Sequence, residues 1–296
     1  MFSSIAIDGK IVVASTMLYL LLGAASLGVS RKTGSAHSQL RMQVHSWWLL
    51  FPAVSLSLCL YPLGPALLTL LIGVLALREL RSQYITRDWR MGAAGVALLM
   101  LMLGLSWFQP RTALGTLPWL AAAPFAYFLY CKKSAALLLS LYVFLCLGIS
   151  FLIQFMHLPQ AAATNLAWLF YLFVMTALND IAQFIAGKAF GRQKIAPRLS
   201  PNKTWQGLAG GIACSVLLSA ALGSYLQLAD LPRLIMIALL LSPGGFLGDI
   251  LFSAAKRYLR IKDFSALIPG HGGILDRVDS LVVTAPLLYF IVCTLH

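Results

Sequence analysis

Long apolar runs alternate with short polar segments along the whole chain. A helix needs roughly 20 apolar residues to cross the hydrocarbon core of a bilayer. Ten stretches approach that length, at residues 11–29, 46–63, 65–80, 91–108, 113–130, 134–157, 162–186, 207–229, 233–252 and 281–296. The pattern therefore predicts an all-α, polytopic membrane protein with about ten transmembrane helices.

Composition supports the same fold class. Hydrophobic residues make up 60% of the chain, charged residues only 10%, and the mean hydropathy is +0.85. A soluble domain carries roughly 25% charged residues. The net charge of +13 would suit a nucleic-acid partner in a soluble protein, but in a membrane protein it indicates basic cytoplasmic loops. We therefore expect contact with membrane lipids and no nucleic-acid partner.

The basic residues between the spans predict the orientation. If the N-terminus lies outside, 19 of the 22 Lys and Arg residues fall on the inner side, and only Lys10, Arg111 and Arg233 fall outside. Lys and Arg are enriched in cytoplasmic loops. We expect a multi-pass protein of the inner (plasma) membrane with cytoplasmic catalytic loops.

Polar residues divide the chain into two predicted regions. Spans before residue 160 contain almost no ionisable side chains, which is typical of scaffold or lipid-facing helices. We interpret residues 1–160 as this scaffold and residues 161–296 as the catalytic region. Its two longest polar stretches, 187–206 and 253–280, both fall on the predicted cytoplasmic side.

The first group of polar residues begins at the end of the seventh span. Asn179 and Asp180 lie in an otherwise apolar stretch, and a carboxylate inside a membrane helix is costly unless it is paired or functional. The segment SPNKTWQG follows, with Ser200, Lys203 and Thr204 in a proline-bounded turn before the next span. A helix start beside an ammonium group suits a phosphate. The chemistry alone leaves phosphate binding and a simple capped helix start equally open.

The second group runs from Asp249 to the last span. Asp276 and Asp279 are three residues apart, so on a helix they share a face. Adjacent carboxylates repel unless a cation lies between them, and Mg²⁺ prefers such oxygen ligands and usually shares its shell with substrate phosphates. Arg257 and Arg277 could each grip phosphate oxygens bidentately. These residues favour a Mg²⁺-dependent reaction on a phosphate compound; the alternative is a charged loop with neutralising surface pairs.

The residues of this second group also resemble a known signature. The positions that match are Ser253, Lys256, Arg257, Lys262, Asp263, His271, Gly272, Gly273, Asp276, Arg277 and Asp279. Their order and spacing resemble the signature of the phosphatidate cytidylyltransferases (CDP-diacylglycerol synthases). Upstream, SPNKTWQGLAGG is similar to the family's S-P-x-K-T-x-E-G segment, and Asn179–Asp180 to its Asn-Asp pair. The resemblance covers roughly residues 175–285.

The resemblance implies that CTP and phosphatidic acid react to give CDP-diacylglycerol and pyrophosphate. It implies that a divalent cation, Mg²⁺, is surrounded by Asp249, Asp276 and Asp279, and that a monovalent cation such as K⁺ lies nearby. The residues expected to be catalytic are Asp249, Asp276, Lys256 and Arg277. Those expected to bind substrate are Asn179, Asp180, Ser200, Lys203, Thr204, Ser253, Arg257, Lys262, Asp263 and His271. A homodimer is a further expectation from the family.

Two positions depart from the family pattern. The Asn-Asp pair is followed by Ile181, where the family often has a hydroxyl residue, and Gln206 stands where it usually has an acid. These changes raise the alternatives of a cytidylyltransferase for another lipid phosphate or a CTP-dependent polyprenol kinase. The non-enzyme alternative is an ion-coupled transporter with an ion site at Asp180 and Asp249, which would favour charges near the membrane midplane.

Overall fold

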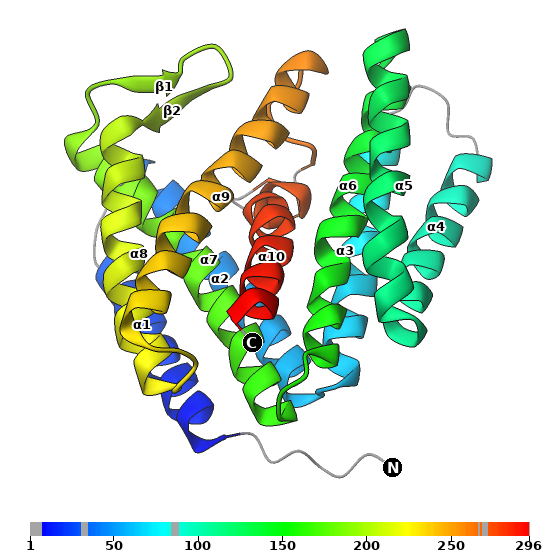
Figure 1. Cartoon of the computed structure of the whole chain (residues 1–296). Coiled ribbons are helices and arrows are strands. Elements are labelled where there is room, and N and C mark those ends of the chain that lie inside the picture. Colours follow the sequence, from blue (N-terminus) through cyan, green and yellow to red (C-terminus); the bar gives the residue numbers. More distant parts are fainter. Residues whose placement is uncertain (1–7, 31–34, 84–88, 266, 268–271, 296) are drawn as a thin grey trace.

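The protein folds as a bundle of helices, described by a computed structural model for residues 8–30, 35–83, 89–265, 267 and 272–295 (Figure 1). Each of the ten predicted spans corresponds to an α-helix in these residues. The helices are α1 (Gly9–Ser30), α2 (Ser35–Cys59), α3 (Leu63–Ser82), α4 (Trp89–Phe108), α5 (Pro110–Cys131), α6 (Ser134–Gln154), α7 (Ala162–Phe190), α8 (Trp205–Tyr225), α9 (Leu231–Tyr258) and α10 (Leu275–Leu295). A short 3₁₀ turn, Phe155–His157, follows α6. The fold class is therefore confirmed.

The expected number of membrane crossings needs a correction. Among the described residues, seven helices are long and apolar enough to cross a membrane. In α2, α4 and α5 the apolar part is shorter, at Val44–Cys59, Gly92–Phe108 and Ala122–Cys131. Their first turns carry polar or basic residues, which shorten the stretch that suits hydrocarbon. The alternation of basic loops therefore does not establish ten crossings.

Two helices extend into a segment that was predicted to be a loop. α9 continues to Tyr258, and α10 begins at Leu275, so only residues 259–274 connect them. Apolarity ends before the helices do. Acidic side chains in the first turn and basic ones in the last turn favour a helix through its macrodipole, and α10 and α9 carry them there.

A two-stranded antiparallel sheet lies between α7 and α8, where we expected only a loop. Its strands are β1 (Lys194–Ala196) and β2 (Ser200–Thr204). Figure 1 shows this hairpin at the same end of the bundle as the C-terminal end of α9. The Tyr258 hydroxyl, at the end of α9, donates to the Lys132 carbonyl between α5 and α6. The segments that follow α5, α7 and α9, all predicted to be inner loops, therefore begin at one end of the molecule.

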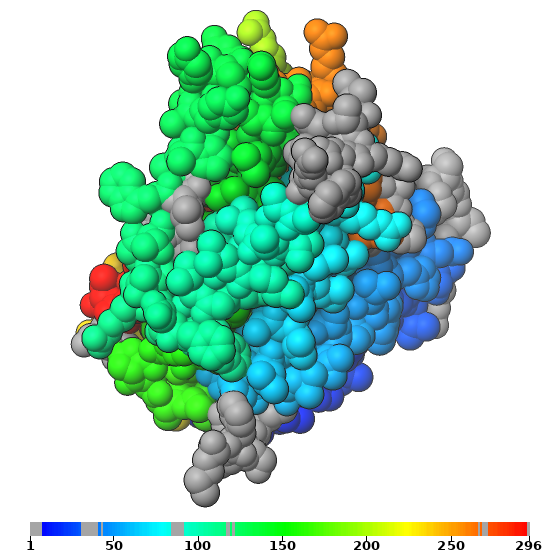
Figure 2. Space-filling model, turned by 90° about the vertical axis from the view of Figure 1, so that its right-hand side faces the viewer, coloured from blue at the N-terminus to red at the C-terminus, as the bar shows by residue number. Residues whose placement is uncertain are grey.

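The helices pack around α6 and α7. α6 contacts α3, α4, α5 and α10, whereas α7, α8 and α9 pack against one another and α10 packs on α9. The two predicted regions therefore share an interface through α10. Figure 2 shows the outer surface of the N-terminal helices, where large apolar side chains such as Phe108, Trp119 and Tyr130 are exposed. Such a surface is suited to lipid.

Candidate active site

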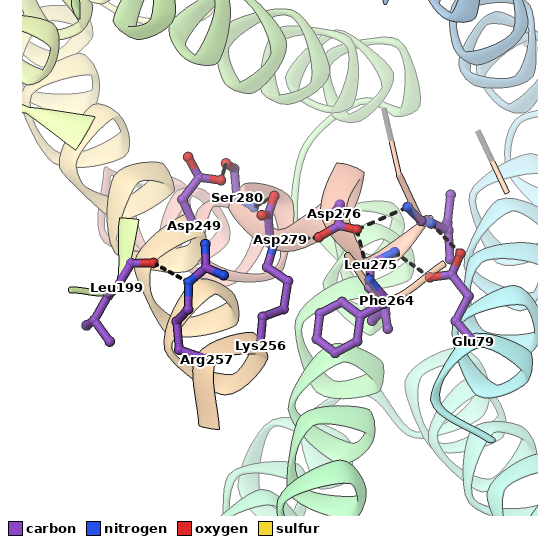
Figure 3. A network of polar contacts seen from close by, with 12 residues as sticks. Glu79, Leu199, Asp249, Lys256, Arg257, Phe264, Leu275, Asp276, Asp279 and Ser280 are labelled. Atoms are coloured by element: carbon purple, nitrogen blue, oxygen red, sulfur yellow. Dashed lines mark hydrogen bonds and ion pairs between the residues drawn. The ribbon is translucent and has the colours of Figure 1, made fainter. Parts of the chain in front are cut away.

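The candidate site residues come together from four elements at the hairpin end of the bundle. α7 supplies Asn179 and Asp180, β2 supplies Lys203, α9 supplies Asp249, Lys256 and Arg257, and α10 supplies Asp276, Arg277 and Asp279. Segments up to 100 residues apart in the sequence thus converge, and Figure 3 shows the part formed by α9 and α10.

Asp249 and Asp279 form an acidic pair between α9 and α10. Their carboxyl groups are close enough to hydrogen-bond. Ser280 fixes both, because its hydroxyl donates to Asp249 Oδ1 at 3.2 Å and its backbone N–H to Asp279 Oδ1 at 2.9 Å. Gly248 allows this approach: a Cβ there would lie 2.3 Å from the carbonyl oxygen of Asp279.

Asp180 adds a third carboxylate beside this acidic pair. It interacts electrostatically with Asp249 and through a hydrogen bond with Ser280. Its Oδ1 is buried and has no hydrogen-bond partner in the described part of the chain. A buried carboxylate oxygen without a partner is costly, so this oxygen favours a cation in the space that it faces.

Lys203 reaches the acidic pair from the hairpin. Its ammonium forms an ion pair with Asp249 and lies 5.2 Å from the centre of the Phe246 ring. Burial alone would lower the pKa of Lys203, but the charges of Asp249 and Asp180 outweigh that effect and raise the pKa above its usual value. Lys203 is therefore a fixed positive charge at physiological pH.

Asp276 has different partners from Asp279, although both lie on the first turns of α10. Its Oδ1 accepts from Lys256 Nζ at 2.6 Å, and its Oδ2 accepts from the backbone N–H of Gly273 at 3.0 Å (Figure 3). A longer contact, 3.4 Å, joins Oδ2 to the backbone N–H of Phe264. Both oxygens are thus engaged, and Asp276 holds Lys256 and the start of α10. Its role as a metal ligand stays a prediction.

The two arginines of the signature differ in burial and in their contacts. Arg257 is exposed, and its Nε donates to the Leu199 carbonyl at 3.2 Å (Figure 3), which ties α9 to the hairpin. Arg277 is half-buried, interacts electrostatically with Asp180 and Asp279, and has a buried Nε without a partner among the described residues. Arg277 is therefore a cation with donor capacity left beside the acidic pair.

The polar residues of the upstream segment mostly serve the fold. The Thr204 hydroxyl accepts from the backbone N–H of Gly207 at 3.1 Å and so caps α8, which was one of the two readings of this segment. Ser200 pairs with Ala196 in the hairpin. Gln206, one of the two departures from the family pattern, contacts the segment before β1, because its Oε1 accepts from the backbone N–H groups of Arg192 and Gln193 at 3.0 and 3.2 Å.

Asn179 lies at the centre of a buried polar contact among three helices. Its Oδ1 accepts from Gln183 at 3.2 Å, from Ser215 of α8 at 3.1 Å and from Ser242 of α9 at 2.5 Å. Asn179 is 4% exposed. These contacts join α7, α8 and α9 next to Asp180. Of the polar pair predicted from the sequence, Asn179 therefore serves helix packing, whereas Asp180 lies at the acidic pair.

Other predicted substrate-binding residues lie around this centre. Ser253 is half-buried one turn after Asp249, and Lys262 and Asp263 are exposed in the connection after α9. His271 lies outside the described residues. Ile181, the other departure from the family, is exposed on α7 and carries no polar group toward the site.

The acidic pair fits the expected divalent cation. Among the described residues, no three His, Cys, Asp or Glu side chains gather closely enough to hold a metal ion by themselves. Mg²⁺ does not require such a cage, since it is usually bound through one or two carboxylates, several waters and substrate phosphates. Asp249 and Asp279, with the unpartnered oxygen of Asp180 nearby, match that chemistry.

Two residues of this region were not singled out from the sequence. Ser280 follows the signature directly and holds both members of the acidic pair. Glu79, in α3, contacts the start of α10 from the other region of the chain. The sequence could have indicated Glu79, because it is an isolated ionisable residue at the end of an apolar span, and such residues are often functional.

Comparisons with known proteins identify relatives of this chain. A model of the cytidylyltransferase family matches residues 41–295. Phosphatidate cytidylyltransferases of Bacillus subtilis and Staphylococcus epidermidis are 38% and 37% identical over 158 and 137 residues, which is 52% and 46% of this chain and 56% and 53% of theirs. The uncharacterised protein YnbB of Escherichia coli is 42% identical over 122 residues, 41% of each chain.

The curated relatives match over about half of their own length or less, whereas the family model extends from α2 to the last residue of α10. It includes all the elements that build the acidic pair and its cations. The chain belongs to the cytidylyltransferase family.

Proposed function

We propose that this protein is a phosphatidate cytidylyltransferase, which transfers CMP from CTP to phosphatidic acid and releases pyrophosphate. The observation that carries the proposal is the acidic pair of Asp249 and Asp279, surrounded by Lys203, Lys256 and Arg277 at one end of a membrane bundle. Two similar proteins are named phosphatidate cytidylyltransferases. A triphosphate, a lipid phosphate and a divalent cation require this mixture of charges.

Asp249 and Asp279 would hold Mg²⁺, and Asp276 stays a further predicted ligand. When bound, the cation would neutralise charge that develops on the departing pyrophosphate. Positive side chains would do the remaining electrostatic work. Lys203 and Arg277 flank the acidic pair. Lys256 is held by Asp276, which lies about one turn before Asp279 on α10. Preorganised cations of this kind stabilise transition-state charge without reorganisation.

The reaction forms a bond between an oxygen of the lipid phosphate and the α-phosphorus of CTP. The bond between the α-phosphorus and the bridging oxygen breaks, and pyrophosphate leaves with the electron pair. Because the nucleophile is already an anion, positioning and charge neutralisation can drive the step without a strong general base.

We also propose an inner-membrane location with the hairpin end facing the cytoplasm. The basic residues of the predicted inner loops support it, and CTP is a cytoplasmic nucleotide. A monovalent cation near the acidic pair and a homodimer stay predictions from the family resemblance.

An assay with CTP labelled at the α-phosphate tests the activity. Purified protein in mixed micelles with phosphatidic acid and Mg²⁺ should move the label into the organic phase. Asp279→Asn should lower the rate by about 10²–10³-fold, the usual cost of removing one electrostatic stabiliser, and EDTA should abolish it. The matched control is Asp230→Asn, because Asp230 is exposed at the start of α9 and, among the described residues, forms an ion pair only with Arg233 in a surface contact.

The result that would contradict the proposal is equally specific. If the α-label stays in water while γ-labelled CTP transfers its phosphate to a polyprenol, the protein is a lipid kinase. If Asp230→Asn and Asp279→Asn lose activity equally, the acidic pair is not the reaction centre.

A further inference from the structure

Glu79 is the only glutamate of the chain, and it is buried at the last turn of α3, with 3% of its surface exposed. Its carboxylate points at the start of α10, almost 200 residues later in the sequence (Figure 3). Oε1 accepts from the backbone N–H of Ile274 at 2.7 Å, and Oε2 accepts from that of Leu275 at 3.1 Å. A side chain of the N-terminal region therefore caps the helix that carries Asp276 and Asp279.

These contacts satisfy a definite need of α10. The first N–H groups of a helix have no partner within the helix, and a negative charge there is favoured by the helix dipole. Ordinarily the capping residue precedes the helix directly. Here that position is occupied by Ile274, whose apolar side chain has no acceptor. The preceding residue is Gly273, where a Cβ would lie 2.5 Å from Glu79 Oε2. The glycine of the signature thus leaves room for the carboxylate of another helix.

The same end of α3 also holds the connection that leads into α10. The Ser265 hydroxyl donates to Glu79 Oε1 at 2.5 Å, and Gln83 Nε2 donates to the Phe264 carbonyl at 2.7 Å. Phe264 and Gly273 are the two residues whose N–H groups contact Asp276. Glu79 therefore contacts Ser265 and Ile274, the sequence neighbours of the two residues that contact Asp276.

Helix geometry turns this cap into a constraint on the reaction centre. One residue of helix corresponds to about 1.5 Å of rise and about 100° of rotation. If α10 began one residue later or slid along its axis, Asp279 and Ser280 would move relative to Asp249 on α9. The contact that crosses from α10 to α9 joins the Ser280 hydroxyl to Asp249 Oδ1 at 3.2 Å. A displacement of α10 by about 1.5 Å along its axis would therefore break this contact.

We propose that Glu79 is a positioning residue for the reaction: it fixes the start of α10 and thereby the distance between Asp279 and Asp249. This inference rests on the proposed function for its kinetic consequence, although the capping contact can be tested without it. It gives the N-terminal region a definite part in the chemistry, beyond that of a scaffold.

The kinetic test compares Glu79→Gln and Glu79→Leu with wild type. Glutamine keeps one acceptor oxygen but presents an NH₂ group to a backbone N–H, and leucine removes both acceptors. Residues that orient metal ligands typically contribute 10–100-fold to metal affinity or activity. We expect kcat to fall about 10-fold for Glu79→Gln and about 100-fold for Glu79→Leu. The Mg²⁺ concentration for half-maximal rate should rise in the same order, and the KM for CTP should change less.

The matched control is Thr69→Val. Thr69 is also buried on α3, and its hydroxyl donates to carbonyls of Pro65 and of Ile149 on α6, at 2.8 and 3.2 Å, so neither acceptor belongs to α10. It should lower thermal stability without changing the Mg²⁺ requirement. If Thr69→Val and Glu79→Leu shift the Mg²⁺ requirement equally, or if neither does, Glu79 only stabilises the fold and the proposal is overturned.

Hydrogen exchange supplies a readout that needs no substrate. In Glu79→Gln, peptides covering residues 272–280 should exchange about tenfold faster than in wild type, in line with the loss of a helix cap, whereas Thr69→Val should leave them unchanged. Unchanged exchange in Glu79→Gln would overturn the proposal. An inactive wild-type protein would end the proposed reaction, and faster exchange in that case would still support Glu79 as the residue that positions α10.

Discussion

The N-terminal and C-terminal regions both form packed helices, but they use polar groups differently. In the first, apart from Glu79 at the end of α3, the buried polar side chains make separate contacts, such as that of the Tyr142 hydroxyl with the Gly95 carbonyl at 3.2 Å. In the second, they are connected: Asn179 joins three helices, and Ser280 joins both members of the acidic pair. Intramembrane polar groups are expensive, so their concentration in one region marks where the chemistry requires them.

Among the contacts that hold the helices and the hairpin of the C-terminal region together, the largest effect should come from breaking the ion pair that crosses from the hairpin to α9. Lys203→Met leaves Asp249 without its ammonium partner and removes a cation from the proposed phosphate site. We expect CMP transfer to fall about 100-fold, as for other electrostatic stabilisers. Lys188→Met is the charge-matched control, because Lys188 is an exposed residue at the end of α7. Equal losses in both variants would mean that only the general positive charge matters.

The same ion pair predicts a pH dependence of stability. The pKa of Lys203 is raised in the folded state, so its stabilising contribution is complete below the ordinary lysine pKa and is lost as the pH rises through the folded value. The difference in unfolding temperature between wild type and Lys203→Met should therefore not decrease as the pH rises from about 6 to 9. A difference that shrank within this range would show that Lys203 loses its proton there.

A smaller effect should follow from removing the polar contact that joins three helices. Asn179→Leu leaves donors of Gln183, Ser215 and Ser242 without their shared acceptor, and each unsatisfied buried group costs about 1–3 kcal/mol. In the N-terminal region, Tyr142→Phe removes one contact between α6 and α4 and should cost about 0.6 kcal/mol, the average for membrane proteins. Equilibrium unfolding in mixed micelles would compare them. Equal costs would remove the distinction between the regions.

The smallest effect should come from restoring the acid that is usual in the family. In Gln206→Glu, a carboxylate oxygen would accept from the same N–H groups of Arg192 and Gln193. Gln206 is half-buried, and a charge that stays partly in water typically contributes no more than about 1 kcal/mol. The KM for CTP should therefore change by less than about fivefold. A larger decrease would mean that this position touches the nucleotide and that the glutamine sets substrate preference.

Hydropathy and the signature predicted the fold and the place of the site for a physical reason. Apolar runs must be helical in lipid because their backbone groups need partners, so every predicted span corresponds to a helix. The ends were less accurate. Hydropathy placed the start of the last span at residue 281, but α10 begins at Leu275, since acidic residues at a helix start stabilise it.

Contacts between helices could not be read from spacing alone. Asp276 and Asp279 share a helix, as their spacing predicted, yet one contacts Lys256 and the other Asp249. Which helix faces which is decided by packing, for instance by the absence of a side chain at Gly248. The partnership of Glu79 with α10 has no local sequence signal, because its partners are backbone groups.

In the proposed reaction, the lengths of α7 and α9 set the level in the membrane at which lipid and nucleotide would meet. Asp180 and Asp249 each lie 18 residues after the start of their helix, which is about 27 Å at 1.5 Å per residue. This length is close to the roughly 30 Å thickness of the hydrocarbon core. A lipid phosphate could therefore reach them while its acyl chains stay in the leaflet. The acceptor would arrive by lateral diffusion, so the rate should follow its mole fraction in the surface rather than its bulk concentration. Dilution with an inert lipid should slow the protein even when the amount of acceptor is unchanged.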